Sequence, residues 1–211
     1  ISPETLIAAL DNNFKGYDKV HLLLLDCPKY GNDDAYADDI MVELQDFIAN
    51  TIRDQRERTN LDWYLNVMIN NKQNTILGRW VGATPDGRKA GKEMANGNTP
   101  SGGKDKNGVT ALLNSLVKPS QEIHAGTVQN IRFGTDFIEN YRDKFECVLQ
   151  TYFKKGGPQA MITVINKGDL EKALVVPEKY KDVFVRIGGF SARYVDLPRD
   201  VQLEILSRKT Y

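Results

Sequence analysis

The chain has 211 residues, a length that suits one large or two small hydrophobic cores. Its 28 basic and 28 acidic side chains balance, so no excess of positive charge indicates nucleic acid or an anionic membrane surface as a partner. The longest apolar run, Leu22–Leu25, is far too short to span a bilayer, and no signal peptide is recognisable, so we expect a cytoplasmic protein.

The first half of the chain predicts mainly helices. A short helix is expected over Pro3–Asn13, and Asp33 and Asp34 precede a long one over Ala35–Arg58. Apolar residues recur on one face of that long helix, at Ile40, Met41, Leu44, Phe47, Ile48 and Ile52. We expect this face to point inward.

A strand and a long loop are predicted next. The β-formers Tyr64 and Val67 favour a strand over Trp63–Ile69, and Ile76–Gly82 is expected to extend that unit. Residues 84–108 are rich in Gly, Pro, Asn, Asp and Lys, which predicts a loop.

The second half alternates between strands and helices. Helices are predicted over Thr110–Val117 and Asp136–Phe153, the second ended by Gly156 and Gly157. The remaining predictions are a strand over Met161–Ile165, a helix over Asp169–Leu174, a strand over Val183–Ile187 and a last helix over Pro198–Arg208. Such alternation predicts an α/β architecture with parallel pairing of strands.

The most informative segment is Arg-Ile-Gly-Gly-Phe-Ser-Ala-Arg-Tyr at residues 186–194. A Gly-Gly pair alone indicates only a turn, here between a strand and a helix. The whole segment resembles the signature of the glycyl radical enzymes, the family of pyruvate formate-lyase and B12-independent glycerol dehydratase. In that signature the fourth position, here Gly189, carries a stored radical. An unpaired electron at Cα is stabilised when the centre is planar, and a side chain hinders that planarity.

Three further blocks carry the same resemblance in the same order. They are residues 28–34 (Pro-Lys-Tyr-Gly-Asn-Asp-Asp), residues 82–90 (Gly-Ala-Thr-Pro-Asp-Gly-Arg-Lys-Ala), and residues 97–101 (Gly-Asn-Thr-Pro-Ser) followed by Gly103, Asp105 and Gly108. Each also has a structural interpretation, since Pro-Asp-Gly is a turn signal by itself.

The resemblance implies an α/β fold that forms part of a ten-stranded α/β barrel, with the glycine loop reaching into the barrel centre. Residues 1–160 would be a barrel scaffold segment and residues 161–211 the glycine radical domain, with the N-terminal part that holds the catalytic cysteine absent. It implies no metal or nucleotide on this chain. The implied partners are a radical S-adenosylmethionine activating enzyme with an iron–sulfur cluster, a small-molecule substrate and a second copy in a homodimer.

The implied activity is that of a glycyl radical lyase or dehydratase. The radical on Gly189 would be relayed to an upstream cysteine thiyl that cleaves a C–C, C–O or C–N bond. Arg186 and Arg193 are expected to anchor the loop or its flanks by hydrogen bonds, Phe190 to pack the loop into the barrel, and the helix at 198–208 to close over it.

Three alternatives stay open. The first is a pyruvate formate-lyase-type formate acetyltransferase, which Gly-Phe-Ser-Ala-Arg disfavours because pyruvate formate-lyase has Gly-Tyr-Ala-Val-Arg there. The second is a stand-alone radical carrier that docks into a partner lacking its own glycine loop. The third is a structural or binding module in which Gly189 is only a turn.

Other chemistry-bearing residues favour structural roles. Cys27 and Cys147 lie far apart with no Cys-x-x-Cys, which favours a reducing compartment, and we expect both to be buried as small hydrophobes. His21 and His124 lack metal-ligand spacing. We expect Asp33, Asp34, Asp38 and Asp39 to form the charged start of a helix and a solvated face rather than a cation site, and residues 98–105 fail the phosphate-loop pattern.

Overall fold

The structure, a computed structural model, describes residues 1–63, 65–69 and 72–211. The helices are α1 (Pro3–Asp11), α2 (Asp18–Asp26), α3 (Ala35–Asp54), α4 (Gln73–Gly78), α5 (Val109–Val117), α6 (Thr135–Asn140), α7 (Arg142–Lys154), α8 (Lys167–Val175) and α9 (Arg199–Ser207). The strands are β1 (Asn66–Met68), β2 (His124–Thr127), β3 (Asn130–Phe133), β4 (Met161–Val164), β5 (Phe184–Arg186) and β6 (Ser191–Arg193). Short 3₁₀ segments lie at Gln55–Arg58, Pro177–Lys179 and Tyr194–Asp196.

The strands form pairs that join distant parts of the sequence. β1 runs parallel to β2, and β3 runs parallel to β4 with Asn130 opposite Met161 and Phe133 opposite Val164. β5 and β6 form an antiparallel hairpin. The predicted α/β character with parallel pairing is therefore confirmed for the first two pairs, and the third pair departs from it.

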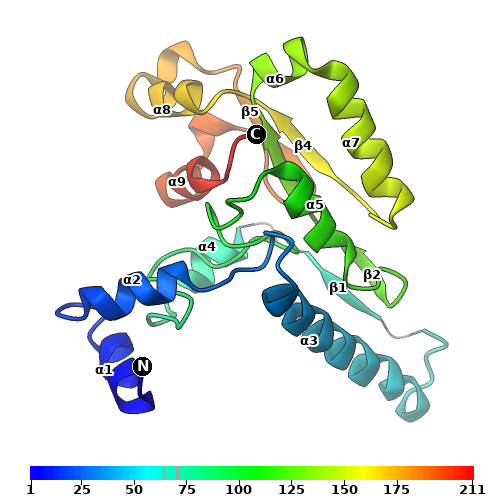
Figure 1. The fold of residues 1–211 in the computed structure, drawn as a ribbon. Coiled ribbons are helices and arrows are strands. Elements are labelled where there is room, and N and C mark those ends of the chain that lie inside the picture. Colours follow the sequence, from blue (N-terminus) through cyan, green and yellow to red (C-terminus); the bar gives the residue numbers. More distant parts are fainter. Residues whose placement is uncertain (64, 70–71) are drawn as a thin grey trace.

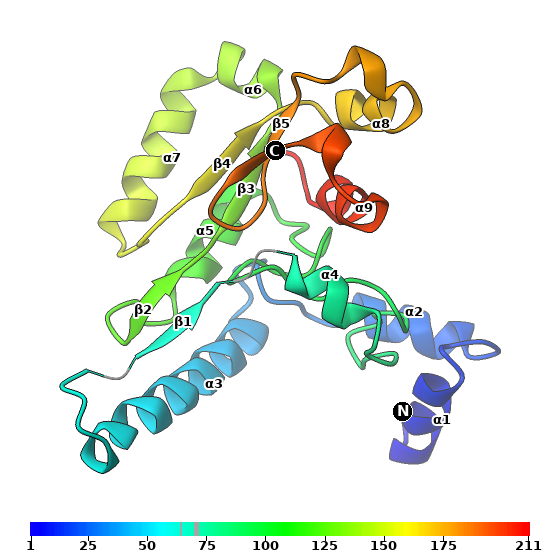
Figure 2. The ribbon, with the colours of Figure 1, turned by 180° about the vertical axis from the view of Figure 1, so that it is seen from behind.

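Helices cover the strands from two sides. Figure 1 shows α6 and α7 on one side of β3, β4 and β5 and α8 and α9 on the other, and the opposite view in Figure 2 shows the same division. One core lies between α5, α7 and β3 and contains Leu112, Leu116, Ile131, Phe133 and Tyr152. A second core lies under α8 and α9 and contains Leu170, Val185, Ile187, Tyr194, Val201 and Ile205.

The predicted helix over 136–153 is wrong at one position. Tyr141 has φ −138° and ψ 39°, which ends α6 and starts α7 in a new direction. The break allows Phe137 and Phe145 to pack on the same ring: their centroids lie 5.3 Å and 5.0 Å from that of Phe133. Tertiary packing of aromatic rings thus overrides a continuous helical pattern.

The region after α3 also departs from the sequence prediction. The strand expected over 63–69 is limited to β1, and Tyr64 lies outside the described residues. The extension expected over Ile76–Gly82 is wrong, because Gln73–Gly78 forms α4. In this helix Gly78 lies so close to the backbone that a Cβ would meet the Lys92 carbonyl oxygen at 2.5 Å.

Helix α3 points its apolar face away from the rest of the chain, contrary to expectation. Its buried residues are Asp38, Gln45 and Ala49. Ile40, Leu44 and Phe47, in contrast, are 56%, 52% and 67% exposed. Although α3 has 20 residues, no helix in the described part of the chain is both long and apolar enough to cross a membrane.

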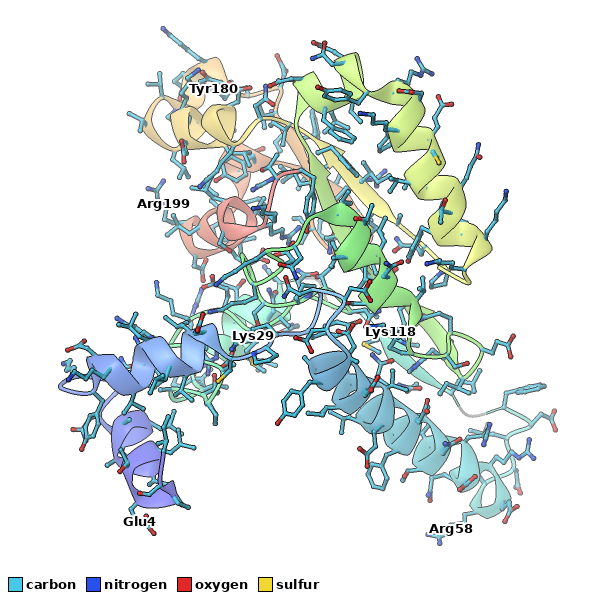
Figure 3. All side chains as sticks on the ribbon, in the orientation of Figure 1. Glu4, Lys29, Arg58, Lys118, Tyr180 and Arg199 are labelled. Carbon is cyan, nitrogen blue, oxygen red and sulfur yellow. The ribbon has the colours of Figure 1, made fainter. Side chains whose placement is uncertain are left out.

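A buried carboxylate ties the start of α3 to the end of α5. Asp38 is fully buried, and its Oδ2 accepts hydrogen bonds from Ser115 Oγ at 2.8 Å and Lys118 Nζ at 2.6 Å. Lys118 also pairs with Asp33 at 2.9 Å, and Figure 3 labels it beside the start of α3. The interpretation of Asp38 as part of a solvated face is therefore wrong, whereas Asp34 caps α3 by accepting from the Tyr36 amide.

Asp38→Ala is expected to lower the free energy of unfolding by about 2–3 kcal/mol, because hydrogen bonds to a buried charge contribute that much. The adjacent Asp39 is exposed, so Asp39→Ala is a matched control that should change stability by less than about 0.5 kcal/mol. Denaturant unfolding of the two variants measures both values. Equal stability of the two variants would contradict the structural role of Asp38.

His124 makes the fold sensitive to acid. Its side chain is buried, and burial lowers the pKa of the imidazole below its ordinary 6.5, with Asp46 opposing that effect. Because the unfolded chain binds the proton more readily, stability should fall as the pH drops below about 6.5 toward the folded pKa. In His124→Phe this part of the pH dependence should disappear from the unfolding midpoint, and an unchanged slope would assign it to another group.

Candidate functional site

The Gly-Gly segment forms the tip of the β5–β6 hairpin. Arg186 lies opposite Ser191, and the Ile187 amide donates to the Phe190 carbonyl at 3.0 Å, which leaves Gly188 and Gly189 as the turn. A strand that the sequence did not predict follows this turn and returns antiparallel to β5, and the expected last helix comes after it as α9. A hairpin places the turn at the extreme end of its two strands.

A side chain at Gly189 would meet no steric obstacle but would strain the backbone. Its φ is +127°, a value that L residues with a Cβ rarely adopt. A Cβ built at this position would meet no atom within 4 Å, and the residue is exposed. Glycine is therefore required here by the backbone angle and not by crowding.

The base of the hairpin is anchored in the second core. Val185 and Ile187 point into it, and Tyr194 is fully buried. The Tyr194 hydroxyl donates to the Gln202 carbonyl at 2.9 Å, while Gln202 Nε2 donates to the Tyr194 carbonyl at 2.9 Å. Burial raises the pKa of Tyr194 to about 12, so it stays neutral. A polar residue in a helical pattern gives no signal of burial, so the role of Gln202 could not be predicted from the sequence.

The residues flanking Gly189 make both backbone and side-chain contacts. The hydrogen bonds described for Arg186 use its backbone: its amide donates to Thr163 Oγ1 and its carbonyl accepts from Arg208. Arg193 forms an exposed ion pair with Asp196 at 3.1 Å. Phe190 is 48% exposed, so in this chain its ring is not packed into a core.

Neither cysteine belongs to the core beneath the hairpin. Cys27 and Cys147 are both exposed, so the expectation that they are buried is wrong. Cys27 follows α2, and Cys147 lies on the outward side of α7 because Phe145 and Tyr152 take the inward positions. His21 Nε2 donates to the Gly87 carbonyl at 2.9 Å, and its ring stacks on Phe14. Across residues 1–63, 65–69 and 72–211 no three His, Cys, Asp or Glu side chains gather as a metal site would require.

The structure brings two of the sequence blocks together. Asn32 Nδ2 donates to the Lys104 carbonyl at 2.8 Å, and Asn32 Oδ1 accepts from the Lys106 amide at 2.6 Å. A Cβ on Gly31 would approach Pro100 Cγ to 2.7 Å, so glycine permits this close contact. Residues 28–34 and 97–108 thus form one loop layer.

The same layer reaches the end of α9. A Cβ on Gly102 would lie 2.5 Å from Ser207 Oγ, and the Tyr211 hydroxyl donates to the Asp105 carboxylate. Burial raises the pKa of Asp105. The remaining block, residues 82–90, makes a local turn. In this turn Thr84 donates to the Asp86 carboxylate and Arg88 donates to the backbone of Gly82. Through residues 97–108 the loop layer therefore contacts the end of α9.

Comparison with known proteins assigns the chain. Residues 94–195 match the family model described as glycine radical, and residues 1–76 match the one described as pyruvate formate lyase-like. The chain belongs to the glycyl radical enzyme family. The β5–β6 hairpin lies within the region that matches the glycine radical model.

Several glycyl radical enzymes are similar over nearly the whole chain. Trans-4-hydroxy-L-proline dehydratase from Clostridioides difficile is 33% identical over 97% of this chain. Its crystal structure superimposes with a TM-score of 0.93 over 100% of the chain. Isethionate sulfite-lyase from Desulfovibrio desulfuricans is 33% identical over 99%, and the B12-independent glycerol dehydratase structure from Clostridium butyricum gives a TM-score of 0.91 at 30% identity over 100% of the chain.

The chain is much shorter than these relatives. It spans 26% of the hydroxyproline dehydratase and of the sulfite-lyase, and 27% of the glycerol dehydratase structure. A glycyl radical enzyme of such length contains about three quarters of its residues outside the region that aligns with this chain.

Proposed function

We propose that this chain is the C-terminal portion of a glycyl radical enzyme of the lyase or dehydratase type, with the radical stored on Gly189. The observation that carries the proposal is the position of Gly189 at an exposed hairpin tip with φ +127° and with open space around its Cα. A hydrogen atom can be removed from such a Cα without the neighbours having to move. The hairpin base is rigid, so the tip is held at a defined place.

Storage of the radical requires a partner that removes one hydrogen atom from Gly189. The family supplies this partner as a radical S-adenosylmethionine activating enzyme with an iron–sulfur cluster. The product is a planar Cα radical conjugated with the adjoining amide nitrogen and carbonyl. No metal or nucleotide on this chain is needed for that state.

In turnover the stored radical takes a hydrogen atom from a cysteine thiol in a part of the enzyme outside this chain. The resulting thiyl takes a hydrogen atom from a substrate carbon, an adjacent bond breaks, and the hydrogen atom is then returned. Cys27 and Cys147 are not proposed for this role, since neither joins the core that holds the hairpin.

The substrate class follows from the relatives. The similar enzymes include a hydroxyproline dehydratase, isethionate sulfite-lyases and a glycerol dehydratase, and also an indoleacetate decarboxylase. The names of the first three point to small polar molecules that carry a hydroxyl group. We extend that class to this protein, in preference to the formate acetyltransferase alternative.

Three observations support a longer protein rather than a stand-alone radical carrier. The aligned relatives are about four times as long. The apolar face of α3 lies exposed, and the blocks at 28–34 and 97–108 build scaffold that a small carrier does not need. In the complete protein we place residues 1–160 in the scaffold of a ten-stranded barrel and residues 161–211 in the glycine radical domain. The second core, which draws only on residues from Ile165 onward, supports this division. The full-length enzyme is proposed to be a homodimer.

The test is electron paramagnetic resonance of the complete protein after anaerobic activation. The one hydrogen left on the radical carbon splits the signal into a doublet. Growth on glycine deuterated at Cα should collapse the doublet to a single line. A radical signal that keeps its shape after this labelling would assign the radical to another residue type and overturn the proposal.

A further inference from the structure

The end of α9 is held by a single buried guanidinium. Arg132, on β3, is 4% exposed and donates from Nη1 to the Ile205 carbonyl at 2.7 Å and from Nη2 to the Leu206 carbonyl at 3.3 Å. It also donates to the Arg208 carbonyl and, through Nε, to Thr210 Oγ1 at 2.7 Å. The last carbonyls of a helix have no partner within the helix and carry partial negative charge. An arginine donates hydrogen bonds to these carbonyls, and its positive charge balances their negative charge.

The chain after α9 is fixed to the same strand through its backbone. The Tyr211 amide donates to the Arg132 carbonyl at 2.9 Å, and the Gly134 amide donates to the Tyr211 carbonyl at 2.7 Å. Arg132 and the residues after α9 therefore move as one unit.

Arg208 extends this unit to the radical hairpin. It binds Glu204 with two hydrogen bonds, Nε to Oε1 at 3.0 Å and Nη2 to Oε2 at 2.8 Å. Its remaining nitrogen, Nη1, donates to the Arg186 carbonyl at 3.1 Å. The pair is largely buried, with the side chains of Arg208 and Glu204 14% and 6% exposed, so solvent screens it little.

Arg186 is the last residue of β5 and lies three positions before Gly189. Arg208 donates to the Arg186 carbonyl and so links the end of β5 to the end of α9. Among the described residues, no other hydrogen bond from a charged side chain makes this link. The cavity lined by Asn130, Arg132, Thr163, Arg186, Ile205 and Arg208 has a volume of about 10 Å³. That volume is at the lower limit for one water molecule.

We infer that Arg208 is a positioning residue that sets the place of Gly189 for hydrogen-atom transfer with the cysteine, and that Arg132 acts through it by fixing the end of α9. This inference rests on the proposed function. Transfer of a hydrogen atom requires close approach, and a displacement of about 1 Å can slow an enzymatic step on the order of 10²-fold. Tyr194 and Gln202 bond the base of the hairpin to α9, and Val201 and Ile205 pack beneath it, whereas Arg208 contacts Arg186, the residue of β5 nearest the turn.

The experiment uses Arg208→Lys in the complete, activated enzyme and needs no substrate. In D₂O the cysteine thiol carries deuterium. When the Gly189 radical takes that deuterium, Gly189 becomes a CHD centre and the sulfur a thiyl. Return of the protium to sulfur leaves a radical carbon that bears deuterium, so the doublet collapses at a rate that reports the transfer.

Lysine keeps a positive charge near Glu204 but is a point charge that cannot reproduce the planar three-way contact. We expect Arg208→Lys to form as much radical per chain as the native enzyme and to slow the collapse on the order of 10²-fold. The matched control is Arg199→Lys, the same change at the other end of α9, because Arg199 (Figure 3) donates to the Leu174 carbonyl in α8 and not to the hairpin. It should collapse at the native rate.

A second variant guards against a folding defect in the first. Glu204→Gln with Arg208→Gln removes both charges together, so no unpaired carboxylate stays buried, and it should slow the collapse in the same way. Collapse at the native rate in both variants, or a loss of radical in parallel with the slower collapse, would overturn the positioning role. A native doublet that never collapses in D₂O would instead contradict the transfer step of the proposed function.

Discussion

Replacing Gly189 with alanine is expected to abolish the radical signal and all turnover while the protein stays folded. The new methyl group meets open space, so packing does not change. The backbone at φ +127° is strained for alanine, which we expect to cost about 1–3 kcal/mol of stability. The radical is lost because a methyl group on Cα hinders the planar, conjugated centre and its formation by the activating enzyme. Paramagnetic resonance and thermal unfolding together measure both effects.

Gly156 provides the matched control for this substitution. Its φ is +96°, and a Cβ there also meets no atom within 4 Å, but it lies in the turn after α7. Gly156→Ala should therefore lose a similar amount of stability and keep full radical content. A normal radical signal in Gly189→Ala would exclude Gly189 as the storage site. Equal loss of radical in both variants would attribute the effect to folding.

Exposure of the activated protein to air is expected to cut the chain at Gly189 and yet leave the two pieces associated. Dioxygen adds to a carbon-centred radical, and the peroxyl product breaks the backbone there. The piece that carries residues 190–211, 22 residues of this sequence, contains β6 and α9. Its side chains Tyr194, Val201 and Ile205 are at most 3% exposed, and burial of each contributes about 1.5–3 kcal/mol. The strand pairing and the four hydrogen bonds of Arg132 add to this binding.

Mass spectrometry checks this result in two ways. Under denaturing conditions the air-exposed sample should give two separate pieces that result from a cut at residue 189. Under native conditions it should give the mass of the uncut protein plus the added oxygen. Gly189→Ala should show no cut. A cut that persists in this variant would contradict the assignment of the radical, and immediate release of the small piece would contradict the packing described for α9.

The sequence located the hairpin glycine but not what surrounds it. The signature at 186–194 stands out because few positions accept such a combination of residues, and β5, α5 and α9 have strong local patterns. Arg132 is buried against partners 73 to 78 residues away in the sequence, whereas Gln202 and Glu204 bond to residues within eight positions. Neither periodicity nor composition reveals that these three polar residues are buried. Strands β2 and β3 are four residues each and are set by pairing with distant segments, so a local pattern could not identify them.

Three further errors concern features that a local pattern does not reveal. The split at Tyr141 follows from aromatic packing on Phe133, which a helical repeat cannot reveal. The cysteines were expected inside because free cysteine is usually buried, but helix α7 turns Cys147 outward. The helix α2 was missed because its leucines at 22–25 form an unbroken run without amphipathic spacing.

The reversed polarity of α3 has a practical consequence for anyone who produces this segment by itself. A helix that presents Ile40, Leu44 and Phe47 to water while it turns Asp38 and Gln45 inward is a site for self-association, since exposed apolar patches promote aggregation. The isolated segment should therefore gain colloidal stability from charged residues at these three outward positions, and the same changes should harm the intact enzyme. Solubility of the piece and assembly of the whole would thus be opposing design goals at one surface.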